Sequence, residues 1–139
     1  MSKSNALEND FVDFLFNATV MPSYGGNLYL SLHTADPGEG GDQTTNEVST
    51  GAYTSYARVA VARDNTGWTV SGSSSTNAAL VQFPQCTGGT GATITHVGIG
   101  TSSSGPGTLL ASGALTAPLA VSNLIQPQFA ASAITYTED

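Results

Sequence analysis

Basic side chains are almost missing from this sequence. Lysine and arginine together number three, against ten aspartates and glutamates, and the formal net charge is -7 at pH 7. Binding to DNA or RNA needs several cationic contacts to phosphates, whereas an acidic protein repels the phosphate backbone. We therefore expect no nucleic-acid partner.

Cysteine and long apolar runs are also scarce. Cys86 is the single cysteine, so no intrachain disulfide can form, and we expect it to be a small buried residue. No stretch approaches the roughly 20 apolar residues that span a membrane. The first residues lack the basic and apolar regions of a signal peptide. We expect a protein that is made in the cytoplasm and does not associate with membranes.

The residue patterns of enzymes and metal sites are missing as well. His33, His96 and Cys86 are scattered without metal-ligand spacing. Neither a nucleophile elbow nor a complete glycine-rich dinucleotide motif occurs. One loop concentrates four acids, but without the ligand order of an EF-hand: Asp36, Glu39, Asp42 and Glu47. We favour a solvated loop over a calcium site, and predict no catalytic residue, no cofactor and no metal.

What is present begins with one helical pattern at residues 5–17. Asn5 can cap the helix, and Glu8 follows three residues later as in a capping box. Apolar residues recur at helical spacing at Leu7, Phe11, Phe14 and Leu15. We predict one short helix within an N-terminal arm of residues 1–23. The helix either covers the mouth of the core or docks on another subunit.

From residue 24 onward the apolar period changes to two. Leu28, Leu30 and Leu32 share one face of a predicted strand. Further β-prone runs follow at 56–63, 67–70, 77–83, 93–100, 108–115, 119–129 and 133–137. Their spacing by Gly, Pro and Ser clusters predicts an all-β fold, an antiparallel jelly-roll-like β-sandwich over 24–139 that forms a single domain with the arm. The expected core is Leu30, Leu32, Val59, Val61, Trp68, Leu80, Phe83, Val97, Ile99 and Ile134.

Three loops separate these runs. Residues 35–54 form the longest, and 71–76 and 101–108 are expected to be hairpin tips or flexible loops. A loop of twenty residues in so small a domain usually binds a partner or stays mobile. We predict that the long loop and the helix make much of the partner contact. The predicted partner-binding residues are Leu7, Phe11, Phe14, Leu15, Asp36, Pro37, Glu39, Asp42, Glu47, Tyr53 and Arg58.

Several segments together resemble a known family. They are LYLSLHTADPG at 28–38, NEVS at 46–49, YARVAV at 56–61, GW at 67–68, HVGIGT at 96–101 and GTLL at 107–110. This set is similar to small virion proteins of tailed bacteriophages, which are described as capsid cement or decoration proteins and as tail-fibre-associated proteins. The resemblance implies a jelly roll without catalytic residues.

Three functions follow as hypotheses. The first is a cement protein on the outer surface of the head, which stabilises contacts between copies of the major capsid protein and sits there as a dimer or trimer. The second is a tail or tail-fibre adaptor. The third, from another class, is a carbohydrate-binding β-sandwich in which Trp68 stacks on sugar rings.

Overall fold

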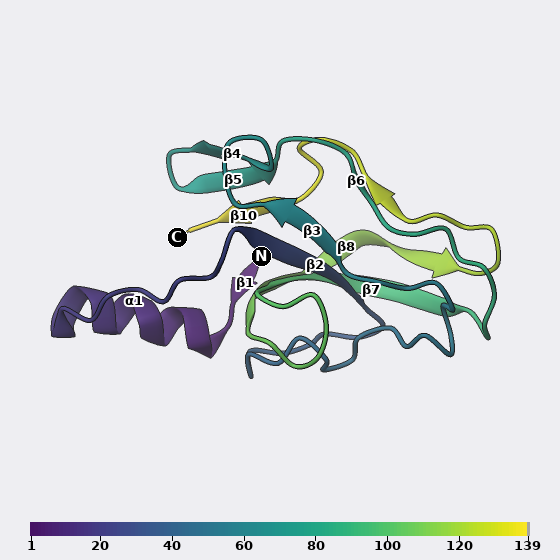
Figure 1. The fold of residues 1–139 in the computed structure, drawn as a ribbon, viewed down its shortest axis with the longest axis horizontal. Coiled ribbons are helices and arrows are strands. Elements are labelled where there is room, and N and C mark those ends of the chain that lie inside the picture. Colours follow the sequence, from purple (N-terminus) through teal and green to yellow (C-terminus); the bar gives the residue numbers. More distant parts are fainter. Residues whose placement is uncertain (139) are drawn as a thin grey trace.

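The fold is built on an antiparallel five-stranded sheet, seen in Figure 1. The computed structural model describes residues 1–138, and Asp139, the last residue of the predicted sandwich, lies outside them. The sheet has the order β1-β8-β7-β2-β3. Its strands are β1 (Ser2–Lys3), β8 (Leu109–Val121), β7 (Ala92–Gly100), β2 (Asn27–His33) and β3 (Val59–Ala62).

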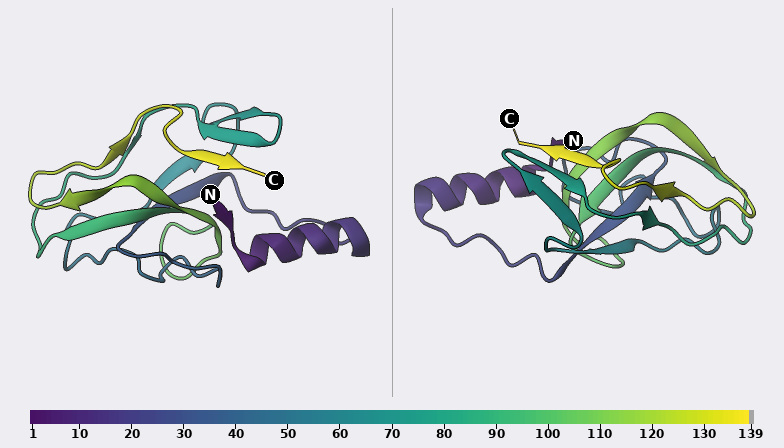
Figure 2. Two further views of the ribbon diagram at one scale, coloured as in Figure 1. Left: turned by 180° about the vertical axis from the view of Figure 1, so that it is seen from behind. Right: turned by 90° about the horizontal axis from the view of Figure 1, so that it is seen from above.

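Two shorter sheets lie over one face of this sheet, as the two views of Figure 2 show. One has the order β10-β5-β4, with β10 (Thr135–Thr137), β5 (Ser74–Asn77) and β4 (Trp68–Ser71). The other pairs β6 (Val81–Gln82) with β9 (Gln128–Phe129). All of these pairings are antiparallel. The predicted all-β, sandwich-like fold with one short helix is confirmed, although its second layer is split in two.

The hydrophobic core fills the space between the layers. Leu30 and Leu32 of β2 are fully buried, and they pack in one cluster with Trp68, Phe83 and Ile134 from the opposite layer. Eight of the ten predicted core residues are buried: Leu30, Leu32, Val61, Trp68, Phe83, Val97, Ile99 and Ile134. Alternation with a period of two therefore identified the inner faces of the strands.

The other two predicted core residues differ from the expectation. Val59 is partly buried and packs against the core. The prediction for Leu80 is wrong, because its side chain is 54% exposed. Leu80 lies in the link between β5 and β6, where Asn77 donates through Nδ2 to the Ala79 carbonyl at 2.8 Å. This link is not a strand, so the period of two does not continue through it.

Strand boundaries also shift from the predicted runs. β8 continues through Pro118 and joins two runs that were predicted as separate. The predicted run 77–83 divides into the end of β5 and the short β6. The predicted hairpin tip at 71–76 is partly strand, since β4 and β5 pair from Ser71 and Ser74 outward. Gly72, with φ +59°, supplies the left-handed turn between them.

The helix α1 (Asn5–Asn17) occupies the predicted range but has a different cap. Ser4, not Asn5, is the N-cap, and its Oγ accepts a hydrogen bond from the Leu7 N–H at 3.4 Å. Ser4 is extended because it continues β1, where its N–H donates to the Leu110 carbonyl. An extended residue before a helix is the geometry that caps require. In the described residues no helix is both long and apolar enough to cross a membrane.

Candidate interaction surface

The helix α1 extends away from the β-sheets instead of lying on them, as Figures 1 and 2 show. Leu7 in its first turn is the only buried residue of the helix. Beyond that turn residues 11–17 are all exposed, although Lys3 Nζ of β1 lies 5.9 Å from the centroid of the Phe11 ring. The predicted alternative in which it closes the core therefore fails, apart from Leu7, and docking on another subunit stays a prediction.

Large apolar side chains line the exposed part of this helix. The exposed fractions are 52% for Phe14, 68% for Leu15 and 80% for Phe16. Phe11 and Val12 are exposed as well. Spacings of three and four residues make Phe11, Phe14 and Leu15 neighbours, and they place Val12 beside Leu15 and Phe16. The result is one continuous apolar surface, which we call the helix face.

The polar side of α1 faces the protein's own chain. Tyr24, in the segment that returns from the helix to β2, donates from its hydroxyl to Asp10 Oδ2 at 2.6 Å. Burial, helped by the nearby Asp10 carboxylate, raises the pKa of Tyr24 to about 12. The Arg63 guanidinium lies 5.5 Å from the Tyr24 ring centroid. These contacts hold the return segment against the polar side, so the helix face points outward.

An apolar groove opens between the two layers close to the base of the helix. Its volume is about 570 Å³. Leu28, Ile99 and Ala111 line it from the large sheet, and Trp68 and Val70 line it from the opposite layer. Val70 is 72% exposed, although it lies two residues after the buried Trp68 and so points to the same inner face. The core is therefore open at this end.

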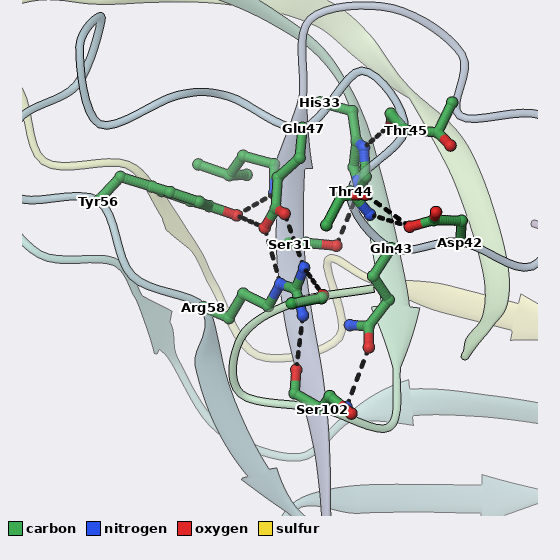
Figure 3. A network of polar contacts seen from close by, with 12 residues as sticks. Ser31, His33, Asp42, Gln43, Thr44, Thr45, Glu47, Tyr56, Arg58 and Ser102 are labelled. Atoms are coloured by element: carbon green, nitrogen blue, oxygen red, sulfur yellow. Dashed lines mark hydrogen bonds and ion pairs between the residues drawn. The ribbon is translucent and has the colours of Figure 1, made fainter. Parts of the chain in front are cut away.

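The long loop, in contrast, is fastened to the body by an arginine, as Figure 3 shows. Arg58 donates from Nε and Nη2 to the two carboxylate oxygens of Glu47, each at 2.7 Å. It also donates to the Ser102 carbonyl at 2.9 Å and the Gly105 carbonyl at 2.7 Å. The hydrogen bonds to Glu47 raise the pKa of Arg58. One side chain thus joins loop 35–54 to loop 101–108.

Neighbouring polar groups complete this network. Tyr56 donates to Glu47 Oε1 at 2.7 Å and accepts from the Leu32 N–H at 3.1 Å, and burial raises the pKa of its hydroxyl. Gln43 is fully buried, and its Oε1 accepts from the Ser102 N–H at 2.9 Å. The two loops are thus linked at several points by bonds within the chain.

Ser31 and His33 form a buried pair beneath the loop. The two side chains meet at 2.8 Å between Ser31 Oγ and His33 Nε2. Since His33 Nδ1 lies 2.9 Å from the Thr45 carbonyl, an acceptor, Nδ1 carries the proton and Ser31 donates to Nε2. Burial lowers the pKa of His33. Both residues are fully buried, so a substrate has no access to this pair.

The structure separates the predicted partner-binding residues into two groups. Pro37, Tyr53 and Leu7 are buried in the protein's own fold, and Glu47 and Arg58 are bonded to each other. Their side chains have structural roles here. The exposed or half-exposed members, for which partner binding stays a prediction, are Phe11, Phe14, Leu15, Asp36, Glu39 and Asp42.

The two aspartates of the long loop cap their own turns. Asp36 Oδ1 accepts from the Gly38 N–H at 2.8 Å, and Asp42 Oδ1 accepts from the Thr44 N–H at 2.7 Å. The hydrogen bonds from Thr44 lower the pKa of Asp42. Among residues 1–138, no three His, Cys, Asp or Glu side chains are grouped as metal ligands.

Glu39 connects the loop to the base of the helix. Its carbonyl accepts from the Asn5 N–H at 3.0 Å, and its Oε1 accepts from Ser2 Oγ at 3.1 Å. The structure thus brings together the two segments that we predicted to bind partners. Trp68, by contrast, has 8% exposure, which argues against a stacking platform for sugars on the protein surface.

Sequence reasoning missed part of the helix face. The predicted stripe ran through Leu7, Phe11, Phe14 and Leu15, and it omitted Val12 and Phe16, which are both exposed. The available signal was the number of apolar residues between 11 and 16, which is too many for one stripe. The groove had no local signal, because its residues come from six strands that are distant in the sequence.

Comparison with known proteins adds one family. A search of curated proteins finds no match. The family described as "Podophage GP4 fiber I protein gp80" matches residues 2–137, nearly the whole chain. The predicted resemblance to virion proteins of tailed phages is confirmed by this match. The chain belongs to this family of phage fibre proteins.

Proposed function

We propose that this protein is a non-enzymatic structural subunit of a phage tail fibre, where it joins neighbouring protein subunits. The observation that carries the proposal is the family match, which spans residues 2–137 and so covers both the sandwich and the helical arm. The arm presents its apolar face outward, as a subunit that must contact a neighbour would.

The buried chemistry supports the non-enzymatic part of this proposal. Ser31 and His33 have the spacing of a nucleophile and a base, but neither reaches the surface. Catalysis requires that the reacting groups touch the substrate. This pair instead stabilises β2 and the long loop from inside.

Capsid cement is the second candidate, and the surface of the small sheet favours it. The outer face of the β4-β5-β10 sheet carries the exposed or half-exposed hydroxyls of Thr69, Ser74, Thr76, Thr135 and Thr137. Neutral hydroxyls can bond across an interface without the cost of burying charge. In this case the partner would be the major capsid protein on the outer surface of the head.

The copy number in purified virions tests the two candidates. Quantitative mass spectrometry compares peptides of this protein with peptides of the major capsid protein, and antibody labelling in electron micrographs gives the location. A fibre subunit is present at a small fraction of the capsid copy number and labels the tail. A copy number close to that of the capsid protein, with label over the head, would instead establish the cement function.

A further inference from the structure

We infer that the helix face of one molecule docks into the apolar groove of a second copy of this chain. The helix face consists of the exposed apolar side chains of residues 11–16, and the groove is the opening beside Val70. This inference deepens the proposed function by naming the partner, and its role in the virion rests on that function. The contact between copies can be tested on the purified protein, without the virion.

The area of the helix face matches what a stable interface needs. With a whole Phe side chain at roughly 200 Å², the exposed fractions of Phe11, Phe14 and Phe16 leave about 340 Å². Val12 and Leu15 bring the total to the order of 500–600 Å². The largest apolar patch on a typical monomer is about 300–600 Å², and a standard interface buries about 800 Å² per partner. One short helix thus supplies most of an interface.

The groove of each copy is apolar, as is the helix face that it would bind. Its walls are apolar, and Val70 stands at an inner-face position that the chain itself leaves uncovered. A helix that inserts aromatic side chains between the two layers would complete the core at that end. Because the helix and the groove are different surfaces, the contact is head-to-tail, and it builds a ring or an extended array of copies.

The distribution of charge agrees with this partner. The helix carries Glu8, Asp10 and Asp13 and no basic residue. Arg63, one of the three basic residues of the chain, lies at the groove. Asp64 lies there too, but its Oδ1 accepts from the Thr66 N–H and hydroxyl. An amphipathic helix on a membrane surface usually has a polar side rich in Lys and Arg, so the acidic helix argues against lipid.

Complementation between two variants tests the inference. The helix variant is F14D/F16D, and the groove variant is V70E, which puts a carboxylate where the helix would dock. Leu80→Glu is the matched control, because Leu80 is also an exposed apolar residue but lies outside both surfaces. Circular dichroism checks that each variant is folded, and light scattering after size-exclusion chromatography gives its mass.

We expect the wild type and L80E to be oligomeric. In each of the other two variants the dissociation constant should rise roughly tenfold or more, because the docked state would bury an unpaired charge. An equal mixture of the helix and groove variants should form dimers, since one retains the groove and the other the helix. An oligomeric V70E protein would overturn the inference in favour of helix-to-helix packing. A failure of the mixture to dimerise would also overturn it.

A monomeric wild type would overturn it too, and flotation with phosphatidylglycerol vesicles would then show whether the helix binds lipid instead. None of these results depends on where the protein lies in the virion. The copy number decides the proposed function separately.

Discussion

Replacing Arg58 with Met should destabilise the fold far more than a surface substitution. The Arg58 side chain is 3% exposed and that of Glu47 is 13% exposed. Removing the guanidinium leaves a largely buried carboxylate without its counterion and two loop carbonyls without donors. Breaking a buried ion pair in this way costs about 3–5 kcal/mol. For a domain of this size the loss lowers the midpoint of thermal unfolding by roughly 10–20 °C.

Thermal and urea unfolding, followed by circular dichroism, measure this loss. Arg63→Met is the matched control, because Arg63 is exposed and donates one bond, to the Gly25 carbonyl at 3.2 Å. Its cost should stay below about 1 kcal/mol. The double variant E47M/R58M removes both charges and should recover part of the loss. If Arg58→Met is no more costly than Arg63→Met, the network does not fasten the loops.

Three further predictions concern other parts of the fold. Burial lowers the pKa of His33 below its unfolded value of about 6.5, so on acidification the unfolded state takes up the proton first. The free energy of unfolding should therefore have its full value above about pH 6.5 and fall towards pH 5 by up to about 1.4 kcal/mol per pH unit. Urea titrations of His33→Gln should lack this slope. Gly67→Ala should lower the free energy of unfolding in urea by about 1–3 kcal/mol, because a Cβ at this position would lie 2.0 Å from the Ala62 carbonyl oxygen. Gly40→Ala is the control and should cost little, because no atom lies within 4 Å of a Cβ there. Equal costs would refute the steric argument. The fluorescence of Trp68 should be blue-shifted and unchanged by added sugars, and a response to sugar would revive the carbohydrate-binding hypothesis.

The parts of the fold that depend on local periodicity could be predicted from the sequence. The alternation of Leu28, Leu30 and Leu32 identified β2 and its buried face, and the spacing of Leu7, Phe11 and Phe14 identified α1. In both cases the signal lies within a few residues of the element that it describes. Leu80 shows the limit, since an apolar residue next to a strand looks the same whether or not the strand continues.

The long loop shows what local patterns cannot reveal. Its order comes from contacts to distant positions, such as the Glu47 bond to Arg58 and the Gln43 bond to Ser102. Nothing near Gln43 in the sequence indicates that it is buried. The direction of the helix was unpredictable for a similar reason, because an apolar stripe shows that a surface needs cover but not whether the cover is in the same molecule.

The order of strands in the large sheet has a consequence for synthesis. β1 at the start of the chain pairs with β8, which begins at Leu109, and β2 pairs with β7, which begins at Ala92. Such distant pairings close slowly. During translation the phenylalanines of α1 leave the ribosome long before the strands that anchor the helix. The nascent chain therefore exposes these apolar side chains before β8 can form, and binding of the segment by a chaperone would protect it until β8 is complete.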